Sequence, residues 1–172
     1  MAVIASLVVG ANGATTLGGI SSPLSTTADR ERFLERHRGA AAFIIGKQSA
    51  AIESYATSDV PIFIFTRNTD QIHFTHPKMQ QVTVDRNLRE ITQLIDLRID
   101  GEIVVEAGPR LLLPMVEVGA IDILELSITP LTGDGNFINV ENLLGNFEIE
   151  SDEEISGTRL LKCRYNRDTS NS

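Results

Sequence analysis

Four short, predominantly apolar segments constrain the fold of this chain more than any other feature of its sequence. They occupy residues 2–9, 41–45, 61–65 and 103–105. Apolar runs of this length are typical of strands that are buried on both faces, as in a parallel sheet. Because stretches with helix signals lie between these runs, the sequence predicts an α/β protein with a mostly parallel sheet.

The stretches between the strands carry helix start signals. Hydroxyl side chains at residues 25–27 can cap a helix over residues 28–38, and Asp29 suits the first turn of that helix. Pro109 suits the first position of a helix over residues 109–118. The remaining predicted elements are helices over residues 47–55 and 87–97 and a short strand over residues 81–85.

The C-terminal part of the chain follows a different pattern. Residues 121–129, 147–151 and 159–165 are predicted strands with no helix between them, which indicates antiparallel pairing at one edge of the sheet. A chain of 172 residues is long enough to bury one substantial core. We therefore expect a single domain over residues 1–166, followed by a polar tail over residues 167–172.

Composition and charge argue against several classes of partner. The net charge is −8, and no stretch clusters Lys and Arg as nucleic-acid binding requires. No apolar run approaches the roughly 20 residues of a membrane span. The single cysteine, Cys163, can form neither an internal disulfide nor a cysteine metal site. We therefore expect a cytoplasmic protein that binds neither nucleic acid nor membranes.

The histidines give no sign of a metal centre. His37, His73 and His76 show no ligand spacing and have no acidic partner in the sequence pattern. We therefore expect no metal site and no catalytic histidine.

Four strand ends combine Gly or hydroxyl residues with the start of a helix or loop: residues 12–15, 46–49, 66–68 and 106–109. In open α/β sheets, ligands bind beyond the carboxyl ends of the strands, and helix N-termini hold phosphates through free N–H groups. The sequence contains neither G-x-G-x-x-G nor a Walker motif. These features predict a pocket for a nucleotide cofactor outside the two standard nucleotide folds.

One continuous stretch carries a more specific pattern. Residues 104–112 read as a strand, then Glu-Ala-Gly-Pro, then a helix, and residues 117–133 continue into another strand that is followed by a Pro and a Gly. This pattern resembles the reductase domain of the bifunctional deaminase-reductase of riboflavin biosynthesis, in the dihydrofolate-reductase-like superfamily. The resemblance implies a three-layer α/β/α fold, NADPH as cofactor, a small heterocyclic or ribosyl-pyrimidine substrate, and a homodimer.

The resemblance also implies roles for particular residues. Thr66 and Arg67 fall where such reductases receive the 2′-phosphate of NADPH, with Lys47 nearby. Ala107 and Gly108 fall where the family carries paired glycines against the cofactor. The full set of implied cofactor contacts is Gly46, Lys47, Ser49, Thr66, Arg67, Ala107, Gly108, Arg110 and Leu111. The implied catalytic residues are Glu106 and Asp29, and the implied substrate contacts are Asn12 and Gly13.

Two alternatives remain beside a pyrimidine reductase. One is a folate-type reductase that uses Asp29 as proton relay. The other is a non-catalytic nucleotide-binding homologue, because residues 10–14 lack the acid and the base that the family carries there. In such folds a cis peptide can join the residues at positions 107 and 108. A distorted peptide with open space in front of Gly108 would favour cofactor binding, whereas a trans peptide with that space filled would count against it. We expect the space to be open.

Overall fold

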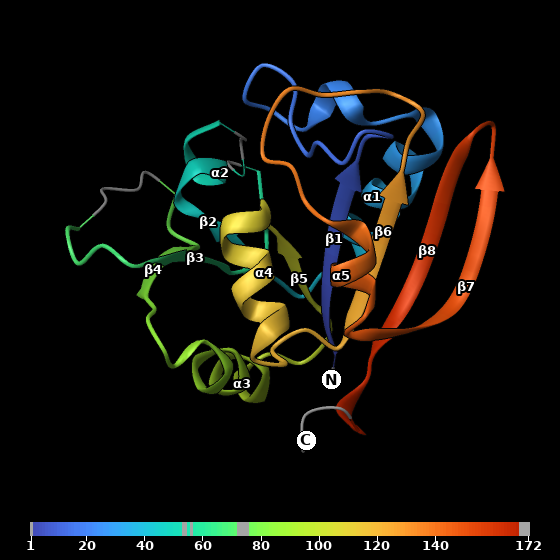
Figure 1. The fold of residues 1–172 in the computed structure, drawn as a ribbon. Coiled ribbons are helices and arrows are strands. Elements are labelled where there is room, and N and C mark those ends of the chain that lie inside the picture. The colour runs from blue at the N-terminus through green and yellow to red at the C-terminus, as the bar shows by residue number, and fades with distance from the viewer. Residues whose placement is uncertain (1, 53–54, 56, 72–75, 169–172) are drawn as a thin grey trace.

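The computed structural model describes residues 2–52, 55, 57–71 and 76–168, and this part of the chain forms an eight-stranded sheet (Figure 1). The order of the strands across the sheet is β4-β3-β2-β5-β1-β6-β8-β7. The strands are β1 (Val3–Val9), β2 (Ala42–Gly46), β3 (Ile62–Thr66), β4 (Met79–Thr83), β5 (Ile103–Glu106), β6 (Ile123–Ile128), β7 (Phe147–Ile155) and β8 (Thr158–Tyr165).

Strand direction reverses at β8 and again at β7, so β8 alone runs against the other strands. All pairs from β4 to β6 are parallel, whereas β8 pairs antiparallel with both β6 and β7. At the centre of the sheet, Ala5 of β1 lies opposite Val105 of β5 and Leu124 of β6. The predicted parallel sheet with antiparallel C-terminal strands is confirmed.

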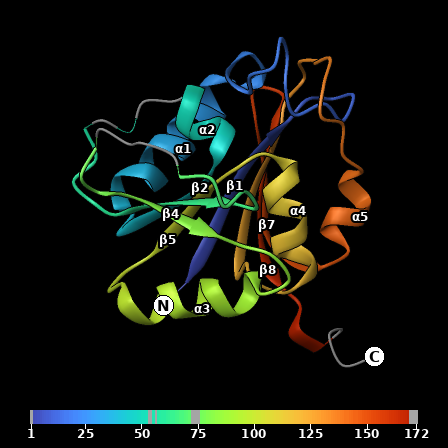
Figure 2. The ribbon, with the colours of Figure 1, turned by 90° about the vertical axis from the view of Figure 1, so that its left-hand side faces the viewer.

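Helices cover both faces of the sheet (Figure 2). Helices α1 (Thr27–Gly39) and α2 (Lys47–Ile52) lie on one face, and α3 (Leu88–Arg98), α4 (Pro109–Glu117) and α5 (Val140–Leu144) lie on the other. A single 3₁₀ turn, η1 (Ser22–Leu24), precedes α1. These three layers confirm the predicted α/β/α architecture. None of the described helices is long and apolar enough to cross a membrane.

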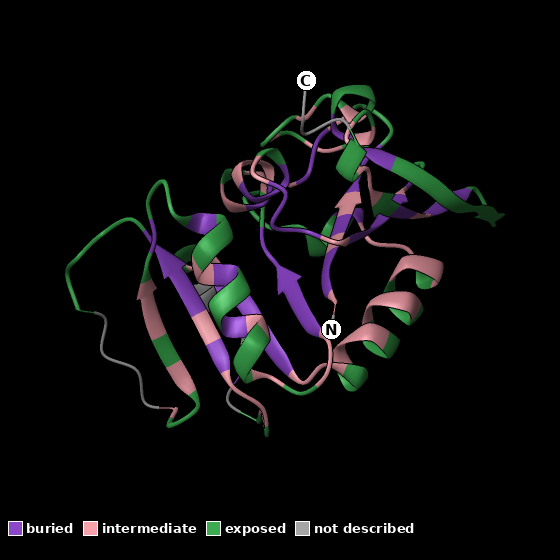
Figure 3. Ribbon diagram, turned by 90° about the horizontal axis from the view of Figure 1, so that it is seen from below, coloured by how far each residue is buried: buried purple, intermediate pink, exposed green. Residues whose placement is uncertain are grey.

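Two apolar clusters of different size pack against the sheet. On the face of α3 and α4, β1 packs its alternate residues against Leu112 and Met115, in the larger of two apolar clusters. The smaller cluster includes Phe43, Ile64 and Val104. Figure 3 shows the central strands buried along most of their length, while the outer faces of the helices are exposed. Neighbouring strand residues point to opposite faces, so Glu106 shares the face of Val104 and α1.

The interface between α1 and the sheet is polar. No described residue of α1 is fully buried. Arg36 pairs with the buried Glu125 of β6 and, at 2.6 Å, with Glu102. Arg32 donates to the Ser127 hydroxyl at 2.9 Å, and burial lowers the pKa of this guanidinium while Glu125 opposes the change. Charged side chains therefore hold α1 on the sheet, in contrast to the apolar contacts of α4.

Several element boundaries differ from the predicted ones. β4 lies two residues earlier than predicted, because its pairing with β3 sets Met79 opposite Ile62. Helix α2 ends at Ile52 rather than at residue 55, and residues 53–54 lie outside the described part of the chain. β7 continues to Ile155, where a tight turn with positive φ leads into β8. The predicted tail is described only as far as residue 168.

Helix α5 was not predicted from the sequence. Its N-cap is Asn139, whose side chain accepts a hydrogen bond from the backbone N–H of Asn142 at 3.0 Å. The helix has only five residues. A helix this short depends on tertiary packing rather than on propensity, and its buried Leu143 joins the larger apolar cluster.

Candidate active site

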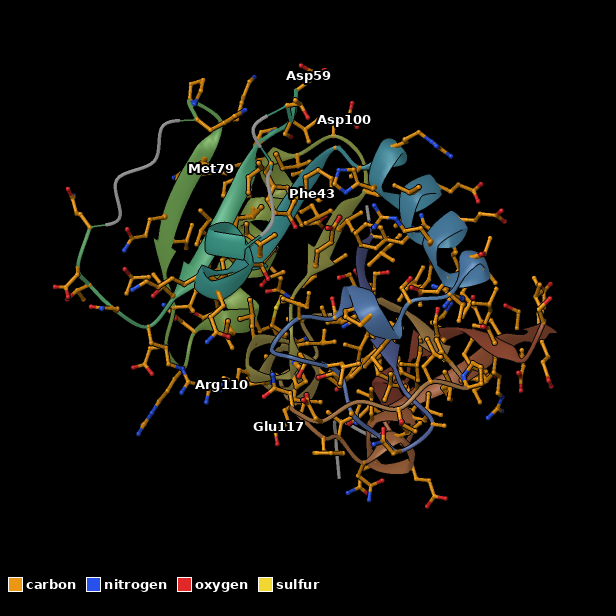
Figure 4. The ribbon with its side chains drawn as sticks, turned by 90° about the horizontal axis from the view of Figure 1, so that it is seen from above. Phe43, Asp59, Met79, Asp100, Arg110 and Glu117 are labelled. Atoms are coloured by element: carbon orange, nitrogen blue, oxygen red, sulfur yellow. The ribbon has the colours of Figure 1, made fainter. Side chains whose placement is uncertain are left out.

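A cavity of about 1220 Å³ lies at the carboxyl ends of β1, β2, β3 and β5. Figure 4 views this end of the molecule from above and labels Arg110, at the start of α4, and Phe43, on β2. The cavity is lined by the middle of β1, the inner side of α1, the β2–α2 junction, the end of β3 and the β5–α4 junction. This position agrees with the general location of ligand sites in open α/β sheets.

The cavity brings together most of the predicted site residues. From the β2–α2 junction come Gly46, Lys47 and Ser49, and from the end of β3 come Thr66 and Arg67. The other predicted residues in its wall are Asp29, Glu106, Ala107, Gly108, Arg110 and Leu111. Residues separated by up to 82 positions in the sequence, such as Asp29 and Leu111, thus face one space.

Asn12 and Gly13, the predicted substrate contacts, lie outside the lining of the cavity. The Asn12 side chain instead joins two loops: its Nδ2 donates to the carbonyl of Gly133 at 2.9 Å, and its Oδ1 accepts from the Gly133 N–H at 3.2 Å. Gly13 has a φ of 85°, which favours glycine. The neighbouring Thr15 and Thr16 reach the cavity wall in their place.

One part of the cavity wall, which we call the cationic side, carries uncompensated positive charge. It consists of the junctions after the neighbouring strands β2, β3 and β5, which supply Lys47, Arg67 and Arg110. None of the three forms an ion pair with any residue that the structure describes. The protein as a whole is strongly acidic, with a net charge of −8. Three cations without carboxylate partners in such a protein indicate a site for an anionic ligand.

The start of α4 adds backbone donors to this cationic side. Gly108 is the N-cap of α4 and supplies no capping side chain. A Cβ built on Gly108 would meet nothing within 4 Å, so the space in front of it is open, as we expected. The peptide between Ala107 and Gly108 is trans. An uncapped helix N-terminus beside open space fits the pyrophosphate of a dinucleotide.

The cavity wall also contains a hydrogen-bonded acid. Glu106, at the end of β5, is 7% exposed. Its Oε2 accepts from the Tyr55 hydroxyl at 3.0 Å, and its Oε1 lies 2.7 Å from Nδ1 of His37. The expectation that His37 has no acidic partner was wrong. The two residues are 69 positions apart, and only the packing of α1 against β5 brings them together.

The helical spacing of residues on α1 could have predicted that His37 lines the cavity. Asp29, Phe33 and His37 follow one another at intervals of four residues on α1, and all three line the cavity. Residues at this spacing share one face of a helix. Once Asp29 is placed at a ligand site, the same face predicts Phe33 and His37 there as well.

Asp29 has a structural role alongside its place in the cavity wall. Its carboxylate accepts a hydrogen bond from the Ser25 hydroxyl, and its backbone N–H donates to the N-cap Thr26 at 3.4 Å. A carboxylate in the first turn also interacts favourably with the helix dipole. The position therefore suits both a cap contact and a ligand contact.

Further polar residues line the cavity without having been predicted: Ser6, Thr15, Ser25, Arg30, Tyr55 and Asn136. Arg30 lies over the ring of Phe33, 5.4 Å from its centroid. In the part of the chain that the structure describes, no group of three or more His, Cys, Asp or Glu side chains is placed to hold a metal ion.

The strand order and the position of the cavity define the class: the chain has the dihydrofolate-reductase-like fold. A dihydrofolate reductase from Enterococcus faecalis, solved with NADP(H), superposes with a TM-score of 0.69 at 12% identity, over 96% of each chain.

Within this class, the structure is similar to reductases of the riboflavin pathway. A pyrimidine reductase-like protein from Corynebacterium diphtheriae matches with a TM-score of 0.69 at 16% identity, over 97% of this chain and 92% of that one. A diaminohydroxyphosphoribosylaminopyrimidine deaminase/5-amino-6-(5-phosphoribosylamino)uracil reductase from Thermotoga maritima matches with a TM-score of 0.66 at 12% identity, over 95% of this chain and 56% of that one. No family model and no curated protein sequence matches the chain.

Proposed function

We propose that this protein is an NADPH-dependent reductase of a small heterocyclic substrate of the ribosyl-pyrimidine type. The observation that carries the proposal is the set of charges that face one cavity. Lys47, Arg67 and Arg110 line it and form no ion pair with any described residue, and the carboxylates of Asp29 and Glu106 line it as well. A dinucleotide needs positive charge for its phosphates, and a reducible ring needs polar groups that orient it and exchange a proton.

The cationic side fits NADPH. Thr66, the last residue of β3, and Arg67, directly after it, would hold the 2′-phosphate, with Lys47 contributing charge from the start of α2. The open N-terminus of α4 at Gly108 receives the pyrophosphate. Reduced nicotinamide supplies the hydride when the cofactor is bound.

The size of the cavity suits a ligand larger than a drug-sized molecule, such as a dinucleotide. Its volume of about 1220 Å³ exceeds the roughly 300–1,000 Å³ that pockets for a single drug-sized ligand occupy. Hydroxyls and carboxylates also line the cavity, including Ser25, Asp29 and Glu106. These groups suit a substrate that is rich in N–H and O–H donors, such as a ribosylated aminopyrimidine.

Two of the similar structures support the same assignment. The Enterococcus faecalis reductase was solved with NADP(H), and the name of the Thermotoga maritima enzyme includes 5-amino-6-(5-phosphoribosylamino)uracil reductase. At 12% identity these likenesses concern the fold. The charges and the open helix end of this chain extend the argument to its own site.

The test is to measure NADPH binding and NADPH oxidation separately. Fluorescence titration should show NADPH binding, and loss of NADPH absorbance should occur with 5-amino-6-(5-phosphoribosylamino)uracil or a related aminopyrimidine. Binding without oxidation of any substrate would favour the non-catalytic homologue. Preferential oxidation with dihydrofolate, abolished by Asp29→Asn, would favour the folate-type reductase. Absence of NADPH binding would overturn the proposal.

A further inference from the structure

Three polar side chains from distant parts of the chain meet in the wall of the cavity. His37 of α1, Tyr55 after α2 and Glu106 of β5 form what we call the His37–Glu106–Tyr55 group. The two hydrogen bonds measure 2.7 Å from His37 to Glu106 and 3.0 Å from Tyr55 to Glu106. Each carboxylate oxygen of Glu106 thus has its own partner.

The members of this group differ in how far they are exposed to solvent. The side chain of Glu106 is 5% exposed, whereas that of His37 is 37% exposed. The imidazole ring packs against Phe43, at 4.5 Å between centroids, and against Phe33, at 5.8 Å. The carboxylate is therefore the inner anchor, and the imidazole is the member that meets the open space.

The electrostatics of this arrangement favour a protonated imidazole. A buried carboxylate requires compensation, and an opposite charge within about 4–6 Å stabilises the charged form of its partner. The titratable groups that face His37 include Glu106 from β5 and Tyr55 from the segment after α2. Tyr55 donates to the second carboxylate oxygen, which leaves the first oxygen directed at Nδ1 of His37.

A comparison on the same helix separates this group from a purely structural ion pair. Arg36, the neighbour of His37, pairs with the buried Glu125 in the polar interface between α1 and the sheet. Neither Arg36 nor Glu125 lines the cavity, whereas His37, Glu106 and Tyr55 all do. Helix α1 is therefore held on the sheet by one acid–base pair and presents another to the ligand space.

We propose that His37 is a catalytic residue that supplies the proton in the reduction, and that Glu106 and Tyr55 are positioning residues that hold its ring. This inference rests on the proposed reductase function. Histidine is suited to this task because it gains and loses a proton near neutral pH. Glu106 holds Nδ1, and the His37 side chain, 37% exposed, lines the cavity in which a substrate would bind.

The reaction step balances as follows in atoms and charge. The substrate carbon of a C=N or C=O bond gains one hydrogen with two electrons from reduced nicotinamide, which is thereby oxidised. The π-electron pair of that bond moves onto the nitrogen or oxygen. That atom takes a proton from the His37 imidazolium, which becomes neutral, and solvent returns a proton to His37.

The catalytic role of His37 is tested by measuring turnover of whichever substrate supports NADPH oxidation in the assay of the proposed function. General acid catalysis typically contributes about 10²- to 10⁴-fold, so His37→Gln should lower kcat by at least about 100-fold while NADPH affinity stays within about twofold. The matched control is His76→Gln, because His76 lies in a turn outside the cavity and should leave kcat unchanged. Added imidazole should restore part of the activity of His37→Ala, which a merely structural loss would not allow. A His37→Gln protein that keeps more than a tenth of wild-type kcat overturns the role.

The protonation state of His37 provides a readout that needs no turnover. The chain has three histidines, so the imidazole nitrogen signals of His37 can be assigned from their loss in His37→Gln. At pH 7 the doubly protonated ring should make up the larger share in the wild type and the smaller share in Glu106→Gln. Equal shares in both proteins would overturn the pairing. A wild type that reduces no substrate but shows the expected spectra would refute the proposed function, and with it the proton role, while leaving the pair established.

Discussion

Arg67→Ala should separate binding of NADPH from binding of NADH. Arg67 follows β3, is exposed at the cationic side of the cavity, and forms no ion pair with any described residue. Its removal therefore costs the protein no internal contact of this kind, and the loss falls on the ligand. A hydrogen bond to a charged group contributes about 1.5–3 kcal/mol, which corresponds to roughly 10- to 150-fold in Kd.

The exposure of Arg67 places the expected effect in the lower part of this range, about 10- to 30-fold, because solvent weakens charge–charge interactions at a surface. The difference between NADPH and NADH should also shrink as salt is added. Fluorescence titration with both cofactors measures the effect, with NADH as the internal control. The matched variant is Arg98→Ala, since Arg98 is exposed at the end of α3 and outside the cavity. Equal losses for NADPH and NADH would refute the assignment of Arg67 to the 2′-phosphate.

Four further predictions concern stability, reactivity and assembly. Glu125→Ala should lower the free energy of unfolding by about 3 kcal/mol, which is the lower end of the range for breaking a buried ion pair. The lower end applies because Arg36, which loses its buried partner, is itself partly exposed. Chemical denaturation measures the change, and a loss below about 1 kcal/mol would contradict the prediction. Gly133→Ala should lower the free energy of unfolding by about 1–3 kcal/mol, because the added Cβ would lie 2.2 Å from the Thr16 carbonyl oxygen. An unchanged melting temperature would contradict the close approach of Gly133 to Thr16. Burial raises the pKa of the Cys163 thiol, so a thiol reagent should modify it only after unfolding, and rapid labelling of the native protein would show that this site opens. As the family resemblance of the sequence implies, the protein should sediment as a homodimer at micromolar concentration, and a monomer there would exclude this assembly.

The acidic outer edge of the sheet bears on how such a dimer forms. β7 is the edge strand, and most of its residues are exposed. Residues 148–154 include five acidic side chains, of which Asp152 and Glu150 pair with Arg159 and Arg164 of the neighbouring β8. Charged side chains on an edge strand oppose edge-to-edge pairing of two copies. A dimer should therefore use another surface of the protein.

Much of the fold follows from local pattern. The apolar runs at residues 41–45 and 61–65 become β2 and β3, because strands covered on both faces need apolar side chains in both directions. The cation-lined side of the cavity was predictable for a related reason. Lys47 and Arg67 directly follow strand ends, Gly108 lies two residues after the end of β5, and the carboxyl ends of parallel strands meet at one edge of a sheet.

The contact between Glu106 and His37 depends on information that no local sequence pattern contains. Glu106 and His37 belong to elements 69 residues apart, and their contact requires both the strand order and the placement of α1 over β5. The polar face of α1 gives the same lesson, because Arg36 reads as a solvent-exposed residue until Glu125 is placed beneath it. Apolar periodicity reports which side of an element is buried, whereas the partner of a charged side chain is set by long-range packing. The strands and the turns that line the cavity were therefore predictable from the sequence, whereas the pairing of His37 with Glu106 depends on the tertiary structure.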